Sequence, residues 1–282
     1  MKSETWPLGV FTSVDAGFGV KLEVAAELGV PTMHLHAPSN LSDPVQAAQD
    51  FRAKSADFEI EPTVIFTEFG DESYESIPIV KETVGLVPES TREKRFEILK
   101  RTVVFAEELE VDAVGLHLGF VPHDSSDPAY GAILETLQDA CTFAKTHQRN
   151  IHLETGQEPA DVLLQFLKAT DRANLFINFD PANMILYGCG EPLPALEQLA
   201  PFVRSVHCKD AISSGQPGVT WGEEKTLGEG DVGMLEYLQV LKKIGYEGPL
   251  TIEREISQEP ERQKAEIGNA VKLLERLKQQ LL

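Results

Sequence analysis

Cysteine is scarce in this chain of 282 residues, and no pattern of paired cysteines is present. The three cysteines are Cys141, Cys189 and Cys208. An odd number of cysteines without an export signal is typical of a reducing compartment, so we expect a cytoplasmic protein with three buried, inert thiols. Residues 1–7 have neither the basic region nor the apolar stretch of a signal peptide.

Basic residues are also few, and this shortage excludes whole classes of partner. Lysine and arginine total 25 against 45 aspartates and glutamates, which gives a formal charge of −20. Nucleic acids and anionic membranes are bound through clustered cations, so we expect neither as a partner. Long hydrophobic runs are missing as well, and no segment approaches the roughly 20 apolar residues of a membrane span.

The order of hydrophobic segments predicts the fold. Short β-like runs alternate with amphipathic helical stretches, a pattern typical of a parallel sheet wound with helices. The expected strands cover residues 8–12, 31–36, 61–67, 112–118, 150–154, 174–180, 203–209 and 249–253. The expected helices cover about 19–28, 42–58, 89–109, 126–148, 159–170, 192–200, 231–244 and 257–281. Eight such pairs, in a chain close to the usual ~250 residues, predict a single α/β domain over residues 1–282, a (β/α)8 TIM barrel.

Four consecutive expected strands end on side chains that bind metals: Glu154, Asp180, His207 and Glu253. Loops at the carboxyl ends of barrel strands build the active site, so these side chains should converge. Three carboxylates and an imidazole suit one divalent ion, Mn²⁺, Mg²⁺, Co²⁺ or Zn²⁺. The alternative is a set of ion pairs around a core histidine. Mutual repulsion of three buried carboxylates favours the metal. Glu255 shares the face of Glu253, so the last ligand could shift by two residues.

Further residues are expected to line the site and contact the substrate. His36 and His117 stand at strand ends, Lys209 alternates with the predicted histidine ligand, and Trp221 lies in a long loop. Packed histidines, charge balance and core cover are their structural alternatives. Glu158 stands at a helix start, where favourable interaction with the helix dipole explains it equally well.

Two expected loops, 68–88 and 210–230, are longer than usual and are typical of substrate walls or lids. The second contains Gly228 and Gly230, and Gly233 follows it. Their spacing matches a phosphate-binding loop only weakly, because acidic residues interleave and no strand directly precedes it. We therefore interpret these glycines as a turn into the following helix.

Five segments together resemble the xylose-isomerase-like sugar isomerase/epimerase superfamily. They are HLETGQE (152–158), NFDPAN (178–183), VHCKD (206–210), LGEGDVG (227–233) and YEGPLTIE (246–253). The resemblance implies that Glu154, Asp180, His207 and Glu253 bind a divalent metal. It also implies that the two glutamates act as an acid/base pair on opposite faces of the substrate.

The chain departs from the ketose 3-epimerase pattern at two positions. Asn183 stands where those enzymes typically carry histidine, and we place it among the substrate-binding residues. Ser213 stands where they carry arginine, while Lys209 and Asp210 resemble inosose dehydratase-like branches.

The sequence therefore predicts a metal-dependent isomerase or epimerase of a keto-sugar or related polyol, with an unphosphorylated substrate favoured because no cation cluster marks a phosphate pocket. The first alternative is a lyase or dehydratase acting on a keto-sugar or inosose. An endonuclease IV-like nuclease and a non-catalytic sugar-binding barrel are further alternatives, and the acidic charge argues against the nuclease. The oligomeric state stays open, a homo-oligomer included.

Overall fold

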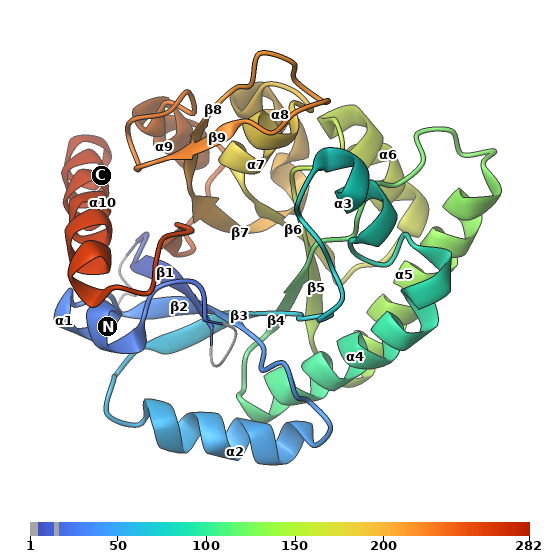
Figure 1. The fold of residues 1–282 in the computed structure, drawn as a ribbon, viewed down its shortest axis with the longest axis horizontal. Helices are drawn as coiled ribbons and strands as arrows, with labels where there is room; N and C mark the ends of the chain where they lie inside the picture. The colour runs from blue at the N-terminus through green and yellow to red at the C-terminus, as the bar shows by residue number, and fades with distance from the viewer. Residues whose placement is uncertain (1–4, 14–16) are drawn as a thin grey trace.

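Eight parallel strands close into a barrel in the computed structural model, which describes residues 5–13 and 17–282. The strands are β1 (Leu8–Ser13), β2 (Thr32–His36), β3 (Glu61–Phe66), β4 (Ala113–Leu116), β5 (Asn150–Glu154), β6 (Leu175–Phe179), β7 (Val203–Cys208) and β10 (Leu250–Ile252). Their order around the barrel is β1-β10-β7-β6-β5-β4-β3-β2. The predicted (β/α)8 TIM barrel is confirmed (Figure 1). Residues 1–4 of the segment inspected for an export signal lie outside the described residues.

Ten α-helices surround the barrel within the described ranges. They are α1 (Leu22–Glu27), α2 (Pro44–Ser55), α3 (Ile77–Thr83), α4 (Glu89–Glu108), α5 (Pro128–Thr146), α6 (Ala160–Thr170), α7 (Pro181–Tyr187), α8 (Pro192–Leu199), α9 (Met234–Lys243) and α10 (Pro260–Leu281). The red helix α10 lies beside the blue α1 and closes the outer ring (Figure 1). In the part of the chain that the structure describes, no helix is both long and apolar enough to traverse a membrane.

Aspartate followed by proline starts several of these helices. Asp43 and Asp127 are N-caps whose carboxylates accept backbone hydrogen bonds, and proline occupies the first turn of each helix. The sequence did not predict α3 and α7, because seven residues are too few to show a helical period. Asp180 followed by Pro181 starts α7 by the same rule, whereas α3 has Ser76 as its N-cap and a proline at its second position.

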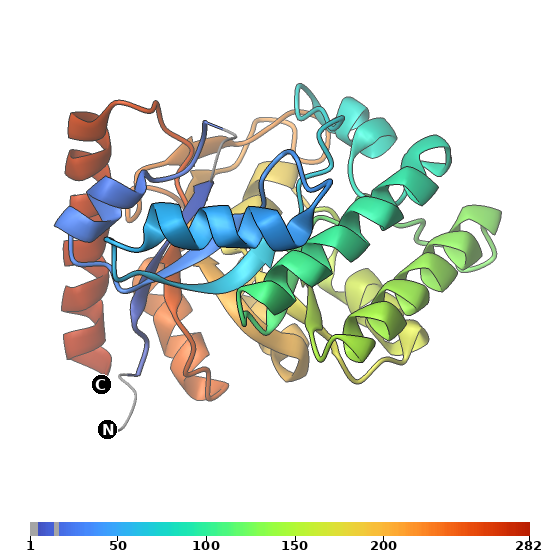
Figure 2. The same cartoon turned by 90° about the horizontal axis from the view of Figure 1, so that it is seen from below.

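Both long loops contain secondary structure that the sequence did not predict. The first contains α3, and the second contains the antiparallel strands β8 (Asp210–Ile212) and β9 (Glu223–Lys225). Both loops lie at the upper rim of the barrel in Figure 2. Buried Arg95 of α4 holds the first loop, because its guanidinium donates to Asp71 Oδ1 at 2.7 and 2.9 Å and to the Gly85 carbonyl at 2.7 Å.

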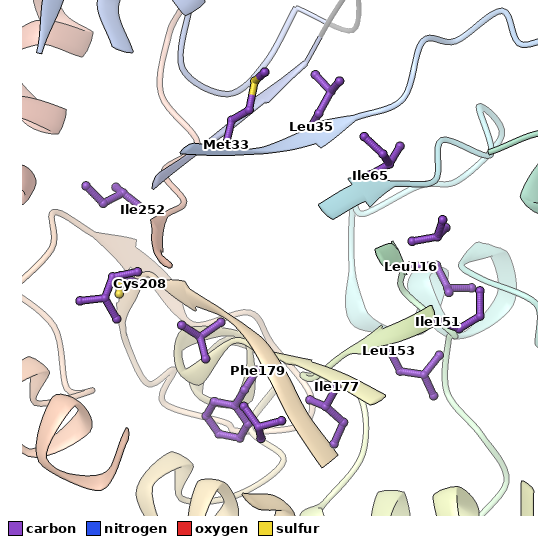
Figure 3. Packing of buried hydrophobic residues seen from close by; sticks show 14 of the residues in the cluster. Met33, Leu35, Ile65, Leu116, Ile151, Leu153, Ile177, Phe179, Cys208 and Ile252 are labelled. Atoms are coloured by element: carbon purple, nitrogen blue, oxygen red, sulfur yellow. The ribbon is translucent and has the colours of Figure 1, made fainter. Parts of the chain in front are cut away.

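The hydrophobic core lies between the barrel and its helices. The labelled side chains in Figure 3, such as Leu35, Ile177 and Phe179, lie on the outer side of the strands. Cys208 is buried among them, as expected for a neighbour of an inward-facing histidine. Cys141 is also buried, but the prediction is wrong for Cys189, which is only partly buried. Burial still raises the pKa of the thiols of Cys141 and Cys189 to about 12.

The carboxylate of Asp210 organises the glycine-rich turn before α9. Its Oδ2 accepts hydrogen bonds from the amides of Gly228 at 2.9 Å and Gly230 at 3.0 Å. Its Oδ1 accepts hydrogen bonds from the backbone amides of Val232 at 3.1 Å and Ala211 at 3.0 Å. A Cβ at Gly230 would lie 2.2 Å from Asp210 Oδ1, so glycine is required there. These amides are already satisfied by an internal anion, which agrees with a turn rather than a phosphate loop.

The Asp210 substitution tests this turn. Asp210→Asn places an amide N–H against backbone donors, and we expect it to lower the free energy of unfolding by about 2–4 kcal/mol. Urea unfolding provides the measurement. The control is Asp231→Asn in the same turn, where the exposed carboxylate accepts one hydrogen bond, from Ser213 N at 3.3 Å. If the two variants lost equal amounts of unfolding free energy, Asp210 would not be the residue that organises the turn.

Candidate active site

Four potential metal ligands from four adjacent strands meet at the mouth of the barrel. Glu154 ends β5, Asp180 follows β6, His207 lies in β7 and Glu253 follows β10. One ligand atom from each residue lies within 4.8 Å of all the others. Asp180 and His207 are fully buried, and Glu154 is nearly so. The structure thus brings together all four residues that the sequence predicted as metal ligands.

The three carboxylates crowd one nitrogen of the His207 ring. Nδ1 lies 2.6 Å from Glu253 Oε2, 2.9 Å from Glu154 Oε1 and 3.6 Å from Asp180 Oδ2. A ring nitrogen carries at most one proton, so it cannot satisfy three carboxylates. Although His207 Nδ1 is near both of them, the buried oxygens Asp180 Oδ2 and Glu253 Oε2 accept no hydrogen bond from any described residue. Such oxygens are costly to bury, and a divalent cation would satisfy them, so the donor set fits a metal ion.

The local electrostatics show how strongly these groups interact. Burial alone would lower the pKa of His207, but the carboxylates of Glu253 and Glu154 raise it well above its usual value. Burial would likewise raise the pKa of Glu253, but the charges of Lys209 and His207 hold it well below its usual range. Burial raises the pKa of Asp180. The cluster therefore depends on positive charge placed among its carboxylates.

The start of α7 positions two residues of this cluster. Asp180 is the N-cap, and its Oδ1 accepts the backbone N–H of Asn183 at 2.9 Å. The Asp180 N–H donates to Thr155 Oγ1 at 2.8 Å, which ties α7 to the end of β5. The Asn183 side chain in turn donates to Glu154 Oε1 at 3.2 Å. The Asp-Pro-Ala-Asn segment therefore forms a helix start and positions a candidate ligand at the same time.

Lys209 adds a buried cation beside the cluster. Its Nζ lies 2.9 Å from Glu253 Oε1 and 3.4 Å from Asn183 Oδ1. Burial alone would lower the pKa of Lys209, but Glu253 and Glu255 raise it well above its usual value. The side chain of Glu255 is 72% exposed, and its carboxylate lies 3.7 Å from Lys209 Nζ. Glu255 therefore lies outside the four-residue cluster.

A cavity of about 790 Å³ opens above the cluster. Five of the six predicted substrate-binding residues line it: His36, His117, Asn183, Lys209 and Trp221. The sixth, Glu158, does not line the cavity. Its buried Oε1 accepts the backbone N–H of Val121 at 2.7 Å, which joins the loops after β4 and β5.

His117 and Trp221 form part of the cavity wall through chains of contacts. His117 Nε2 lies 3.3 Å from Glu154 Oε2, and its Nδ1 lies 3.2 Å from the Gln157 amide nitrogen. Gln157 also donates to the Tyr187 hydroxyl at 3.2 Å. The Tyr187 ring packs on Trp221 with centroids 4.6 Å apart. His117 and Trp221 thus pack against neighbouring side chains and also face the cavity.

Several lining residues escaped prediction because tertiary structure alone brings them here. Glu68, Glu72 and Tyr74 come from the loop after β3, and Glu224 and Arg254 come from β9 and the end of β10. The unusual length of the two loops was the signal that could have found most of them.

His36 and Glu68 form an ion pair of 3.0 Å that lines the cavity. This hydrogen bond lowers the pKa of Glu68. The pair lies at the ends of β2 and β3. His36 lines the cavity, as the sequence predicted, but the sequence did not predict its acidic partner.

Barrel, cavity and cluster together define a class of protein. The model of the xylose isomerase-like TIM barrel family matches residues 22–278, and the chain belongs to that family. A xylose isomerase domain protein from Planctomyces limnophilus has a similar solved structure, with 49% identity, 99% of each chain covered and a TM-score of 0.92. A D-tagatose 3-epimerase-like protein shares the fold at 22% identity over 98% of this chain and 100% of that chain, with a TM-score of 0.72.

An uncharacterised protein of Methanocaldococcus jannaschii is 28% identical over 205 residues, which cover 68% of this chain and 64% of that protein. The chain thus spans less than two thirds of that relative's length.

The buried Glu158 predicts a change in the pH dependence of stability. Burial raises its pKa from 4.5 to about 8, so between these pH values the folded protein holds a proton that the unfolded chain has lost. Stability should therefore fall as pH rises through this window. The Gln side chain of Glu158→Gln cannot lose a proton, and it can still accept the hydrogen bond from the Val121 N–H. The loss of unfolding free energy between pH 5 and 8 should therefore be smaller in this variant by about 2–4 kcal/mol.

Urea unfolding at pH 5, 6, 7 and 8 measures the effect. Glu229→Gln, at an exposed position, is the control and should follow the native profile. If Glu158→Gln also followed that profile, the buried carboxyl would not be the titrating group.

Proposed function

We propose that the protein is a divalent-metal-dependent isomerase or epimerase of a keto-sugar or related polyol. The observation that carries the proposal is the crowding of three carboxylates on His207 Nδ1, with oxygens of Asp180 and Glu253 left without partners. Membership of the xylose isomerase-like family supports this class of reaction.

Glu154, Asp180, His207 and Glu253 would hold the ion, and their three carboxylates favour Mn²⁺ or Mg²⁺, with Co²⁺ or Zn²⁺ as alternatives. Such an ion polarises a carbonyl and makes the neighbouring C–H more acidic. The chain itself must then supply groups that move the proton.

In this proposal Glu154 and Glu253 are those groups. They stand at the two ends of the row β5-β6-β7-β10, so their carboxylates can approach a substrate from two sides. Lys209 and His207 keep Glu253 ionised, the form that accepts a proton. His117 Nε2 and the Asn183 amide lie against Glu154 and hold it in place. One glutamate, as a carboxylate, would remove the proton, and the other, as a carboxylic acid, would deliver a solvent-exchangeable proton to the carbon.

The cavity favours a neutral substrate. Its lining contains six glutamates: Glu68, Glu72, Glu154, Glu224, Glu253 and Glu255. Lys209 and Arg254 are the lysine and arginine among the lining residues, and both are paired. Lys209 lies 2.9 Å from Glu253, and Arg254 lies 2.9 Å from Glu224 and 3.0 Å from Glu266. A phosphate would find no unpaired lysine or arginine among the described lining residues, which favours an unphosphorylated sugar.

A metal-dependent lyase or dehydratase is the second candidate. Lys209 favours it, because its buried ammonium faces the cavity and can donate a hydrogen bond to the oxygen of a departing hydroxyl. The same proton abstraction would then be followed by loss of water. Masses of the products separate the two reactions, since only the second candidate releases water.

Solvent exchange tests the two-glutamate proposal. The Mn²⁺-loaded protein should incorporate deuterium from D₂O into one member of a panel of unphosphorylated keto-sugars, as followed by mass spectrometry. Glu154→Gln and Glu253→Gln should each slow incorporation by at least about 100-fold, because each removes one proton carrier and one carboxylate of the proposed metal site.

Glu247→Gln, at an exposed position after α9, is the control and should exchange at the native rate. Native exchange rates in both active-site variants would rule out the mechanism. Sugar binding without exchange or turnover would instead support a non-catalytic barrel.

A further inference from the structure

The second ring nitrogen of His207 has a partner of its own. Nε2 points away from the carboxylates and lies 3.0 Å from Nδ1 of His34. His34 is a buried residue of β2, which is not a neighbour of β7 in the barrel. The contact therefore crosses the barrel interior beneath the cluster, and neither the sequence pattern nor the proposed reaction accounts for it.

We infer that His34 is a positioning residue that fixes the tautomer and ring orientation of His207, and thereby strengthens divalent-cation binding by the four-residue cluster. This inference rests on the metal site of the proposed function. It adds a residue that contacts neither the cation nor the substrate.

The inference follows from the hydrogen-bonding capacity of the two rings. A neutral imidazole has one N–H and one free lone pair. His207 Nδ1 faces the carboxylates, so it must present its lone pair to a cation, and the proton must then lie on Nε2. A buried N–H needs an acceptor, and His34 Nδ1 occupies that place. The proton of His34 then lies on its own Nε2.

Aromatic packing holds both rings in this arrangement. The Phe66 ring lies 5.7 Å from the His34 ring and 5.4 Å from the His207 ring, and Phe11 meets His207 edge-on at 5.6 Å. Gly115 leaves room for Phe66, because a Cβ there would lie 2.8 Å from the Phe66 ring. Packed aromatic rings offer no alternative hydrogen-bond acceptor for His207 Nε2.

A neutral acceptor such as His34 also suits the charge of the site. Metal-bound histidines often donate their second N–H to a carboxylate, which raises the basicity of the ring. Here three carboxylates already face His207. A neutral acceptor orients the ring without adding a fourth negative charge to a buried cluster.

Amide variants of His34 separate positioning from packing. His34→Asn carries an amide oxygen where the imidazole Nδ1 lies, whereas His34→Gln places its amide about one bond further out, near Nε2. Both are neutral and polar, so their burial costs are similar. His34→Phe keeps a ring but removes the acceptor. Each protein is stripped with a chelator and titrated with MnCl₂ by calorimetry, and circular dichroism checks the metal-free fold.

We expect His34→Asn to bind Mn²⁺ within about threefold of the native affinity. His34→Gln and His34→Phe should bind about 10–100-fold more weakly, the usual effect of losing such an orienting partner. If His34→Gln and His34→Phe both bound Mn²⁺ with native affinity, the inference would be overturned. Failure of the native protein itself to bind Mn²⁺ would overturn the metal site, so the two failures are distinguishable.

Nitrogen NMR of the native protein gives an independent readout that requires no variant. With Mg²⁺ bound, the His207 Nε2 should show the chemical shift of a protonated ring nitrogen coupled to a hydrogen. A deprotonated Nε2 would overturn the inference even if every variant failed to fold.

Discussion

Three carboxylates, two of them buried and that of Glu253 partly buried, crowd one imidazole nitrogen at the mouth of the barrel, and much of the upper barrel can be understood from that constraint. Like charges this close repel, and burial removes the water that would screen them. Without a cation, His207 and Lys209 must supply the compensating positive charge, which is why their pKa values rise. A divalent ion would supply that charge directly, beside the two buried oxygens that lack a hydrogen-bond partner among the described residues.

The fold supports this centre by fixing each ligand through a separate device. Strand pairing aligns β5, β6, β7 and β10, and the start of α7 anchors Asp180. The rings of Phe11 and Phe66 pack against the ring of His207. Around the mouth, charges are paired among themselves, as in His36 with Glu68 and Arg254 with Glu224. The four-residue cluster thus lies under a cavity in which charged side chains of the lining are paired with one another.

Residues that depend on local pattern were predictable. The four ligands follow directly from strand ends, because parallel strands in a barrel deliver their carboxyl ends to one rim. Cys208 faces the helix layer because side chains alternate along a strand. These inferences need only the position of a residue in its own element.

Residues that depend on distant contacts were not predictable. The helices α3 and α7 and the hairpin β8–β9 are too short to carry a period. Glu158 was expected near the substrate but turns to Val121, and Glu68 was missed because a loop returns it to His36. His34 lies on the same strand face as His36, yet its contact with His207 depends on the barrel closing.

Anomalous diffraction tests the central claim most directly. Crystals grown with excess manganese and measured at its absorption edge should show one strong peak within coordination distance of Glu154, Asp180, Glu253 and Nδ1 of His207. A peak held by other residues, or no peak among these four, would contradict the account.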